Sequence, residues 1–268
     1  MEDFEMKKIY FALMALFITT ITVSCSSGNQ SSVTKSENVE LTVSAAASLN
    51  DALTELVSMF EKDHQNIHLL LNFGSTGALQ QQIVQGAPVD LFISAAKDKF
   101  ELLIKKDLVQ KKGSIDLLGN DLVLITNKQN PTQINSFSNL TDRGIKKLAI
   151  GTPETVPAGK YAMQTLKKSH IWSTVKPKII FTKDVRQVLT YVESGDVDAG
   201  IVYMTDAKIS DKVKLAAVAD KSLHDPIIYP AGILKASKHP KEASKFLSYL
   251  QSKQAKAIFE KYGFKVLD

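Results

Sequence analysis

Hydroxyl side chains stand at the ends of several apolar runs in this sequence. Ser48 follows the run that ends at Ala46, Ser75 and Thr76 lie between two glycines, and Tyr203 closes a third run. Each of these groups could donate a hydrogen bond to a ligand. Taken singly they are ambiguous, because serine and threonine also cap helices and a tyrosine often belongs to the core.

Two further turns offer backbone N–H groups instead of side chains. Pro157 is a typical first residue of a helix and would leave the N–H of Ala158 in the first turn. Asp184 is expected to cap a helix, which places Val185 in its first turn. The first N–H groups of a helix have no partner within it and carry about half a positive charge, so they bind anions without a charged side chain.

Neutral donors restrict the kind of anion that would bind. They suit an anion with no proton to give, whereas phosphate near pH 7 keeps a proton and gains from a buried acceptor. Asp184 is the only carboxylate in these turns, and capping is expected to occupy it. The residues therefore favour sulfate, molybdate or tungstate over phosphate.

The turns need strands and helices to position them. Apolar runs predict strands at residues 41–46, 68–73, 89–94, 121–126, 148–151, 178–181, 199–203 and 213–219. Helical patterns begin at Ser48 and Ala158 and cover residues 78–85, 185–193 and 239–261, while residues 226–234 are mixed. This alternation predicts βαβ units, a parallel sheet and the α/β class. Ligands of open α/β sheets lie beyond the carboxyl ends of the strands, where these turns would be.

Composition excludes several other classes. With 268 residues, 44% hydrophobic and 23% charged, the chain is typical of a folded protein of one or two domains. Its net charge of +5 comes from scattered lysines, so no nucleic-acid partner is expected. A single cysteine excludes an internal disulfide. His64 and His68 have helical spacing, but a solvated loop is the better interpretation than a metal site.

Enzyme motifs are missing from the sequence. No Gly-x-Ser-x-Gly nucleophile turn occurs. Gly159-Lys160 suggests a phosphate loop, but Glu154 stands where that loop needs its first glycine. We therefore expect a binding protein and no enzyme, and no cofactor.

The N-terminus is typical of an exported protein. Residues 1–24 combine a basic pair with a short apolar run and are predicted to be a signal peptide, with Met6 as an alternative start. The segment before Cys25 resembles the lipobox of bacterial lipoproteins, although Thr22 replaces the usual leucine. That resemblance implies acylation of Cys25, with residues 25–39 as a flexible tether on the outer face of the cytoplasmic membrane. An ordinary signal peptide with an incidental cysteine, and hence a periplasmic protein, is the alternative.

Several motifs together resemble the molybdate-binding proteins of bacterial ABC importers, the ModA family. They occur in the family's order from about residue 40 to the C-terminus. The matching stretches are Val43-Ser44-Ala45-Ala46-Ala47-Ser48-Leu49, Phe73-Gly74-Ser75-Thr76-Gly77, Gly86-Ala87-Pro88-Val89-Asp90-Leu91-Phe92-Ile93-Ser94-Ala95, Leu118-Gly119-Asn120, Val156-Pro157-Ala158-Gly159-Lys160-Tyr161-Ala162, Asp184-Val185-Arg186, Gly200-Ile201-Val202-Tyr203 and Ile258-Phe259-Glu260-Lys261-Tyr262-Gly263-Phe264.

The resemblance implies a set of ligand-binding residues. The family holds its oxyanion by hydrogen bonds alone, so these residues would contact the molybdenum or tungsten only through the oxygens of the anion. The implied donors in this sequence are Ser48, Thr76, Ala158, Val185 and Tyr203, with Ser75 as a further contributor. Thr76 replaces the commoner serine, which keeps the hydroxyl but stiffens its rotamer.

The resemblance also implies the architecture and the partners. It predicts a two-lobed periplasmic-binding-protein-like fold of type II, with the ligand cleft between the lobes and two hinge crossovers. Lobe I would comprise residues 40–118 and 229–268, and lobe II residues 119–228. The expected ligand is molybdate or tungstate, which are nearly equal in size, with sulfate or phosphate as the alternative. A monomer that delivers its ligand to the permease of an ABC importer is expected, with both lobe faces beside the cleft docking on the permease.

Overall fold

A computed structural model of the chain describes residues 38–130 and 132–267. The predicted signal peptide and Cys25 lie outside the described residues, as does nearly all of the predicted tether.

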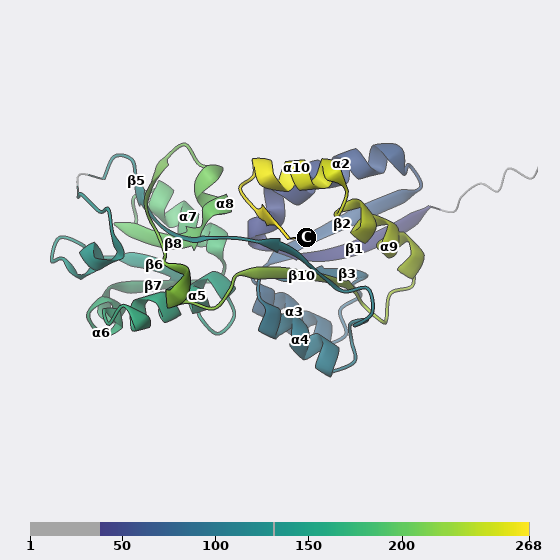
Figure 1. The fold of residues 1–268 in the computed structure, drawn as a ribbon, viewed down its shortest axis with the longest axis horizontal. Helices are drawn as coiled ribbons and strands as arrows, with labels where there is room; N and C mark the ends of the chain where they lie inside the picture. The colour runs from purple at the N-terminus through teal and green to yellow at the C-terminus, as the bar shows by residue number, and fades with distance from the viewer. Residues whose placement is uncertain (1–37, 131, 268) are drawn as a thin grey trace, which may run out of the picture. The chain divides into compact units, whose positions relative to one another are not determined.

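Two mixed β-sheets organise the described chain (Figure 1). We call each sheet with its packed helices a lobe. The six strands of lobe I, in spatial order, are β11 (Lys265–Val266), β4 (Ile115–Gly119), β10 (Ile228–Ile233), β3 (Leu91–Ile93), β1 (Val39–Ala46) and β2 (Ile67–Gly74). The five strands of lobe II are β7 (Ile179–Thr182), β6 (Leu148–Gly151), β8 (Ala199–Tyr203), β5 (Leu122–Asn127) and β9 (Val213–Val218).

The α/β class is confirmed, but the predicted parallel pairing holds for only part of each sheet. β1 pairs in parallel with β2 and β3, and β6 with β7 and β8. β10 runs antiparallel to β3 and β4, and β5 antiparallel to β8 and β9. A buried apolar run has the same pattern in either direction, so the sequence could not distinguish these strands.

Helices cover both faces of each sheet. In lobe I, α2 (Asn50–Asp63) and α10 (Lys253–Lys261) lie on one face, and α3 (Thr76–Val84) and α4 (Lys97–Lys105) on the other (Figure 1). In lobe II, α7 (Val185–Glu193) and α8 (Met204–Lys208) lie opposite α5 (Pro157–Lys168) and α6 (Trp172–Val175). The remaining helices are α9 (Pro240–Tyr249) and the 3-10 turns Ala47–Leu49, Phe137–Thr141, Lys176–Lys178 and Lys221–Leu223.

The apolar spacing of α2 shows why the helices dock as they do. Leu53, Leu56, Val57 and Phe60 recur every three or four residues, and all four are buried against the lobe I sheet. The helical pattern predicted after Ser48 is therefore confirmed, although the helix itself begins at Asn50.

The chain passes between the lobes twice. It leaves lobe I after β4 through Asn120 and Asp121 to β5, and it returns between β9 and β10. β4 and β10 pair antiparallel, with Gly119 opposite Ile228, so the start of the first passage lies beside the end of the second. Lys265 of β11 forms an ion pair with Asp121, which ties the C-terminal strand to the first passage.

Some elements escaped the sequence interpretation. It assigned neither α4, β4 nor α8, and it left residues 226–234 mixed, where the structure has β10. Pro230 interrupts that pattern, and the register of β10 against β4 shifts between Tyr229 and Pro230. A strand tolerates proline at such an irregularity, because the missing N–H is not required there.

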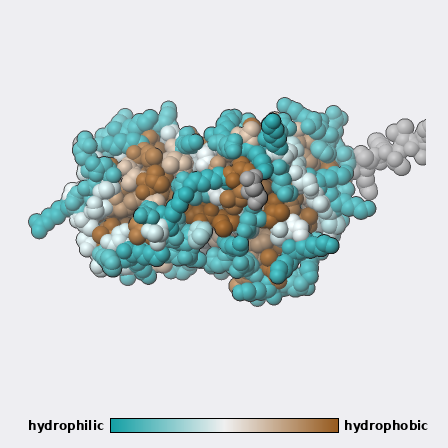
Figure 2. Space-filling model, in the orientation of Figure 1, coloured by the Kyte–Doolittle hydropathy of each residue, from teal (hydrophilic) through white to brown (hydrophobic). Residues whose placement is uncertain are grey.

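Few large hydrophobic side chains are exposed among the residues that the structure describes. The exposed large hydrophobic side chains are spread over β2, α3, α4, β7 and β9. Figure 2 shows a face that is mostly hydrophilic, broken by separate hydrophobic areas. No helix in the described part of the chain combines the length and apolar character that a membrane crossing requires.

Candidate functional site

The six ligand-binding residues predicted from the sequence line one cavity. Lobe I contributes Ser48, Ser75 and Thr76, and lobe II contributes Ala158, Val185 and Tyr203. All six are buried, with at most 7% of the residue exposed. Residues up to 155 positions apart in the sequence thus line the same cavity. We take this cavity as the candidate site.

Three helices begin at this cavity, each directly after a strand. α3 follows β2, α5 follows β6 and α7 follows β7. The predicted helix starts are confirmed, because Pro157 is the first residue of α5 and the Asp184 carboxylate accepts from the N–H of Gln187 at 2.9 Å. The N–H groups of Ala158 and Val185 therefore lie in first turns, where no carbonyl of the same helix reaches them.

Close packing of two glycines fixes the start of α5. A Cβ on Gly159 would lie 1.8 Å from the carbonyl oxygen of Gly151, and one on Gly151 would lie 2.3 Å from the side chain of Val156. Only glycine permits this approach of helix to strand. The approach carries the N–H of Ala158 to the cavity.

Ser48 does not cap a helix, contrary to one of its two sequence interpretations. It lies inside the 3-10 turn Ala47–Leu49, and α2 starts only at Asn50. Its Oγ lies 2.9 Å from Oη of Tyr229 in the buried interior. Because the 3-10 turn lies between β1 and α2, the Ser48 side chain does not cap α2 and is available to the cavity.

The other two hydroxyl groups are also set up as donors. Thr76 Oγ1 accepts from the backbone N–H of Ala95 at 2.9 Å, so its own proton remains available to the cavity. Oη of Tyr203 is buried and has no hydrogen-bond partner among the described residues. Burial raises the pKa of Tyr203 well above its usual value, so the phenol keeps its proton.

A charged network lies next to the donors. Arg186 follows Val185 on α7, and its Nη2 reaches Oδ2 of Asp51 on α2 at 2.5 Å and the carbonyl of Ser48 at 3.4 Å. Its Nε lies 2.9 Å from Oδ1 of Asp206, whose other oxygen accepts from the backbone N–H of Tyr203 at 3.2 Å. Arg186 thus connects donor-bearing segments of both lobes.

Asp206 is an unusual carboxyl group. Its side chain is fully buried, and burial raises its pKa from 3.8 to about 6, although Arg186 and the N–H of Tyr203 act in the lowering direction. This pKa shift corresponds to a difference of about 3 kcal/mol in the free energy of proton binding between the folded and unfolded states. The folded protein binds this proton more tightly than the unfolded chain does, so the contribution to stability is present at low pH and is lost as pH rises through about 6.

Two further contacts join the lobes around the cavity. The N–H of Gly77 on α3 donates to the carbonyl of Thr155 at 2.9 Å. Lys160 of α5 pairs with Asp98 of α4 at 3.1 Å. The latter pair is partly exposed and contributes little on its own.

The cavity is small. About 10 Å³ is open to the centre of a water molecule, which is about the space that one water needs. A space of this size suits only a compact ligand.

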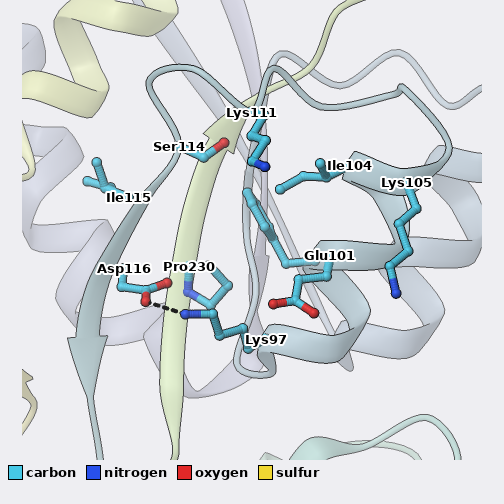
Figure 3. Close-up of a pocket in the computed structure, with 10 residues that line it drawn as sticks. Lys97, Glu101, Ile104, Lys105, Lys111, Ser114, Ile115, Asp116 and Pro230 are labelled. Atoms are coloured by element: carbon cyan, nitrogen blue, oxygen red, sulfur yellow. Dashed lines mark hydrogen bonds and ion pairs between the residues drawn. The ribbon is translucent and has the colours of Figure 1, made fainter.

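A larger cavity of about 520 Å³ lies on lobe I between α4, β4 and β10 (Figure 3). It contains none of the predicted residues. Figure 3 shows lysines from α4 and the following loop around an exposed Lys97–Asp116 pair of 2.7 Å. Its polar groups are exposed or paired with each other and do not converge on one point, so we place no site there.

Metal chemistry finds no support on the described residues, where no cluster of three or more His, Cys, Asp or Glu side chains could hold an ion. His64 and His68 have separate partners. Nδ1 of His64 lies 3.0 Å from the carbonyl of Phe60, and Nδ1 of His68 lies 3.0 Å from Glu61.

Sequence reasoning missed the residues behind the donors. Arg186 and Asn120 were read only as parts of motifs, and none of Asp51, Asp206 and Tyr229 was given a role in the ligand site. One signal was present: the chain has only two arginines, and one of them follows an expected donor. The partners of Arg186 are 135 positions before it and 20 after it, a juxtaposition that only the fold creates.

Comparisons with known proteins support the expectation of a binding protein. A family model described as bacterial extracellular solute-binding protein matches residues 41–265. The chain is 51% identical to YvgL of Bacillus subtilis, provisionally named an ABC transporter substrate-binding lipoprotein, over 97% of this chain and 98% of that one. It is 38% identical to the molybdate-binding protein ModA of Haemophilus influenzae, over 85% of this chain and 90% of that one.

A solved structure gives the same match. It is the substrate-binding domain of a provisionally assigned molybdenum ABC transporter from Clostridium difficile. Its TM-score is 0.68 at 41% identity, over 86% of this chain and all of that one.

Proposed function

Because the chain belongs to the bacterial extracellular solute-binding proteins, and within them to the family of ModA relatives, we propose that it binds molybdate outside the cytoplasmic membrane for an ABC importer. As a solute-binding protein, the chain is not an enzyme. Tungstate, of nearly equal size, is proposed as a second ligand.

The convergence of proton donors on one small cavity carries this proposal. Ser48, Thr76 and Tyr203 offer hydroxyl groups, and Ala158 and Val185 offer backbone N–H groups. The starts of α3, α5 and α7 add the positive ends of three helix dipoles. Neutral donors and helix ends suit a compact dianion, since no salt bridge is needed to hold it.

The anchoring and partners follow from the same family assignment. We propose that Cys25 is acylated and tethers a monomeric binding protein to the outer face of the membrane, which agrees with the lipoprotein name of the Bacillus subtilis relative. The permease would dock on the faces of both lobes beside the cleft.

Another oxyanion is the alternative ligand. Sulfate shares the charge and shape of molybdate but is smaller. A closed shell of donors leaves some of its groups unpaired around a smaller ion, so we expect sulfate and phosphate to bind more weakly.

A calorimetric titration of the chain from residue 38 tests the assignment. Molybdate is expected to bind one-to-one, with excess sulfate unable to displace it. The apo protein should also gain about 2.7 kcal/mol of stability at a molybdate concentration of 100 Kd. Equal responses to molybdate and sulfate would return the ligand to the general oxyanion class, and no response would refute the proposal.

Val185→Pro tests a backbone donor directly. Proline is tolerated as the first residue of a helix, and Asp184 before it has an extended backbone (φ −156°, ψ 173°) that a following proline favours. The substitution removes only the N–H, so molybdate affinity should fall by about 10- to 100-fold while the fold survives.

Val185→Ala is the matched control, because it shortens the side chain but keeps the N–H group. It should bind molybdate within a few-fold of the wild type. Calorimetry compares the two variants, and thermal melting confirms that both are folded. Equal affinities of the two variants would remove Val185 from the set of donors.

A further inference from the structure

A chain of hydrogen bonds leads from the first passage between the lobes to the cavity wall. Nδ2 of Asn120 donates to Oη of Tyr229 at 3.2 Å, and that oxygen lies 2.9 Å from Oγ of Ser48. All three residues are buried. Ser48 lines the cavity, whereas Asn120 and Tyr229 do not.

The direction of this chain is fixed at its far end. Oδ1 of Asn120 accepts from the backbone N–H of Asp121 at 2.9 Å, and a backbone N–H can only donate. The amide nitrogen therefore faces Thr205, at 3.0 Å, and Tyr229. Because an amide N–H cannot accept, the Tyr229 oxygen accepts from Asn120 and turns its single proton to Ser48.

Ser48 is thereby set to donate toward the cavity, since one of the two lone pairs of its oxygen is already used. Its oxygen accepts from Tyr229, so its own proton is free to donate to a ligand. Thr76 has the same arrangement, with the N–H of Ala95 in place of the tyrosine. The N–H of Ala95 can only donate, so the direction of its hydrogen bond to Thr76 is fixed. Without Asn120, the hydrogen bond between Ser48 and Tyr229 could run in either direction.

We propose that Asn120 and Tyr229 hold the Ser48 hydroxyl as a permanent donor, and that this makes the site select oxyanions without a proton over those that carry one. The inference rests on the proposed function, since it concerns the same cavity. A protonated oxygen that faces a fixed donor leaves both protons unpaired, which penalises its binding.

Most of the other polar groups at the cavity are donors. The N–H groups of Ala158 and Val185 can only donate. Tyr203 keeps its phenol proton, because burial raises its pKa, so it too can donate to an anion. Asp184 also lines the cavity, and one oxygen of its carboxylate is engaged as the cap of α7.

Sulfate and phosphate form the decisive pair of probes. They are nearly equal in size, but at pH 7 only phosphate carries a proton, so the ratio of their affinities isolates the proton from the size of the cavity. We expect the wild type to prefer sulfate, measured by titrating each anion alone into the apo protein.

Tyr229→Phe removes the group that holds Ser48. The serine hydroxyl can then rotate and accept, so the sulfate-to-phosphate affinity ratio should fall by about tenfold. Asn120→Asp goes further, because a carboxylate accepts from Tyr229 and reverses the chain. Ser48 would then donate to Tyr229 and present its lone pairs to the anion, so the ratio should fall further than in Tyr229→Phe.

Phe264→Leu is the control for packing alone. The ring of Phe264 packs edge-to-face on Tyr229 with centroids 5.4 Å apart, and its loss breaks none of these hydrogen bonds. It should change both affinities alike and leave their ratio at the wild-type value, with melting curves to confirm folding of every variant.

The outcomes separate the two proposals. An unchanged ratio in both Tyr229→Phe and Asn120→Asp, or an equal change in Phe264→Leu, would overturn the inference and leave molybdate binding intact. A wild-type protein that binds no oxyanion at all would overturn the proposed function together with it.

Discussion

Gly77→Ala is expected to fold normally but to lose at least about a hundredfold in molybdate affinity. A Cβ at this position would lie 2.7 Å from the backbone of Thr155, and Gly77 also donates its N–H to that residue across the lobe boundary. The lobes could not close, so Ala158, Val185 and Tyr203 could not reach an anion held by lobe I.

The substitution should not harm lobe I itself. Gly77 is the second residue of α3 and is not among the described residues with a positive φ, and alanine is a better helix former by about 1 kcal/mol. Calorimetry gives the affinity, and melting of the apo protein gives the stability.

Gly144→Ala is the matched control, because its nearest contact would be a side-chain carbon of Thr132 at 4.0 Å. It should bind as the wild type does. Wild-type affinity in Gly77→Ala would show that ligand binding does not need this closed arrangement.

Arg186→Ala is expected to cost about 3–5 kcal/mol of stability near neutral pH, because it leaves the fully buried Asp206 without its cation. That is a large part of the total stability of a typical domain, about 5–15 kcal/mol. Asp51 should suffer less, since its side chain is 41% exposed and can be solvated.

The loss should depend on pH in a definite direction. In the wild type, the raised pKa of Asp206, about 6, means that the folded state binds the proton more tightly, so this carboxyl group stabilises less as pH rises to about 6. Without Arg186 the pKa of Asp206 rises further. The pH range over which this carboxyl group loses its stabilising effect then extends above about 6. The stability difference between the two proteins should therefore grow with pH above about 6 and shrink below it.

Urea unfolding of the apo proteins at pH 5.5 and pH 8 measures this difference. Asp51→Ala serves as a control that should lose less than about 1 kcal/mol. The double substitution Arg186→Ala with Asp206→Ala should cost no more than Arg186→Ala alone, because no buried charge then remains. An equal loss at both pH values would rule out the buried charge as the cause.

The sequence alone determined the local features of the site. Hydrophobic runs, the proline at the start of α5 and the aspartate that caps α7 are set by residues close in the chain, so Ala158 and Val185 could be placed in first turns before any fold was known. The same local rules were insufficient at Ser48, where an intervening 3-10 turn moved the helix start to Asn50. Strand direction also escaped, because an apolar run does not encode it.

Only the tertiary structure decided which groups stand behind the donors. Tyr229 reaches Ser48 across 181 positions, and Arg186 reaches Asp51 across 135. A hydroxyl group alone can donate or accept, and its role is set by the partner on its other side. That partner is brought there by the pairing of β10 in lobe I and by the approach of α7 to α2, and such long-range contacts leave no periodic signal in the sequence.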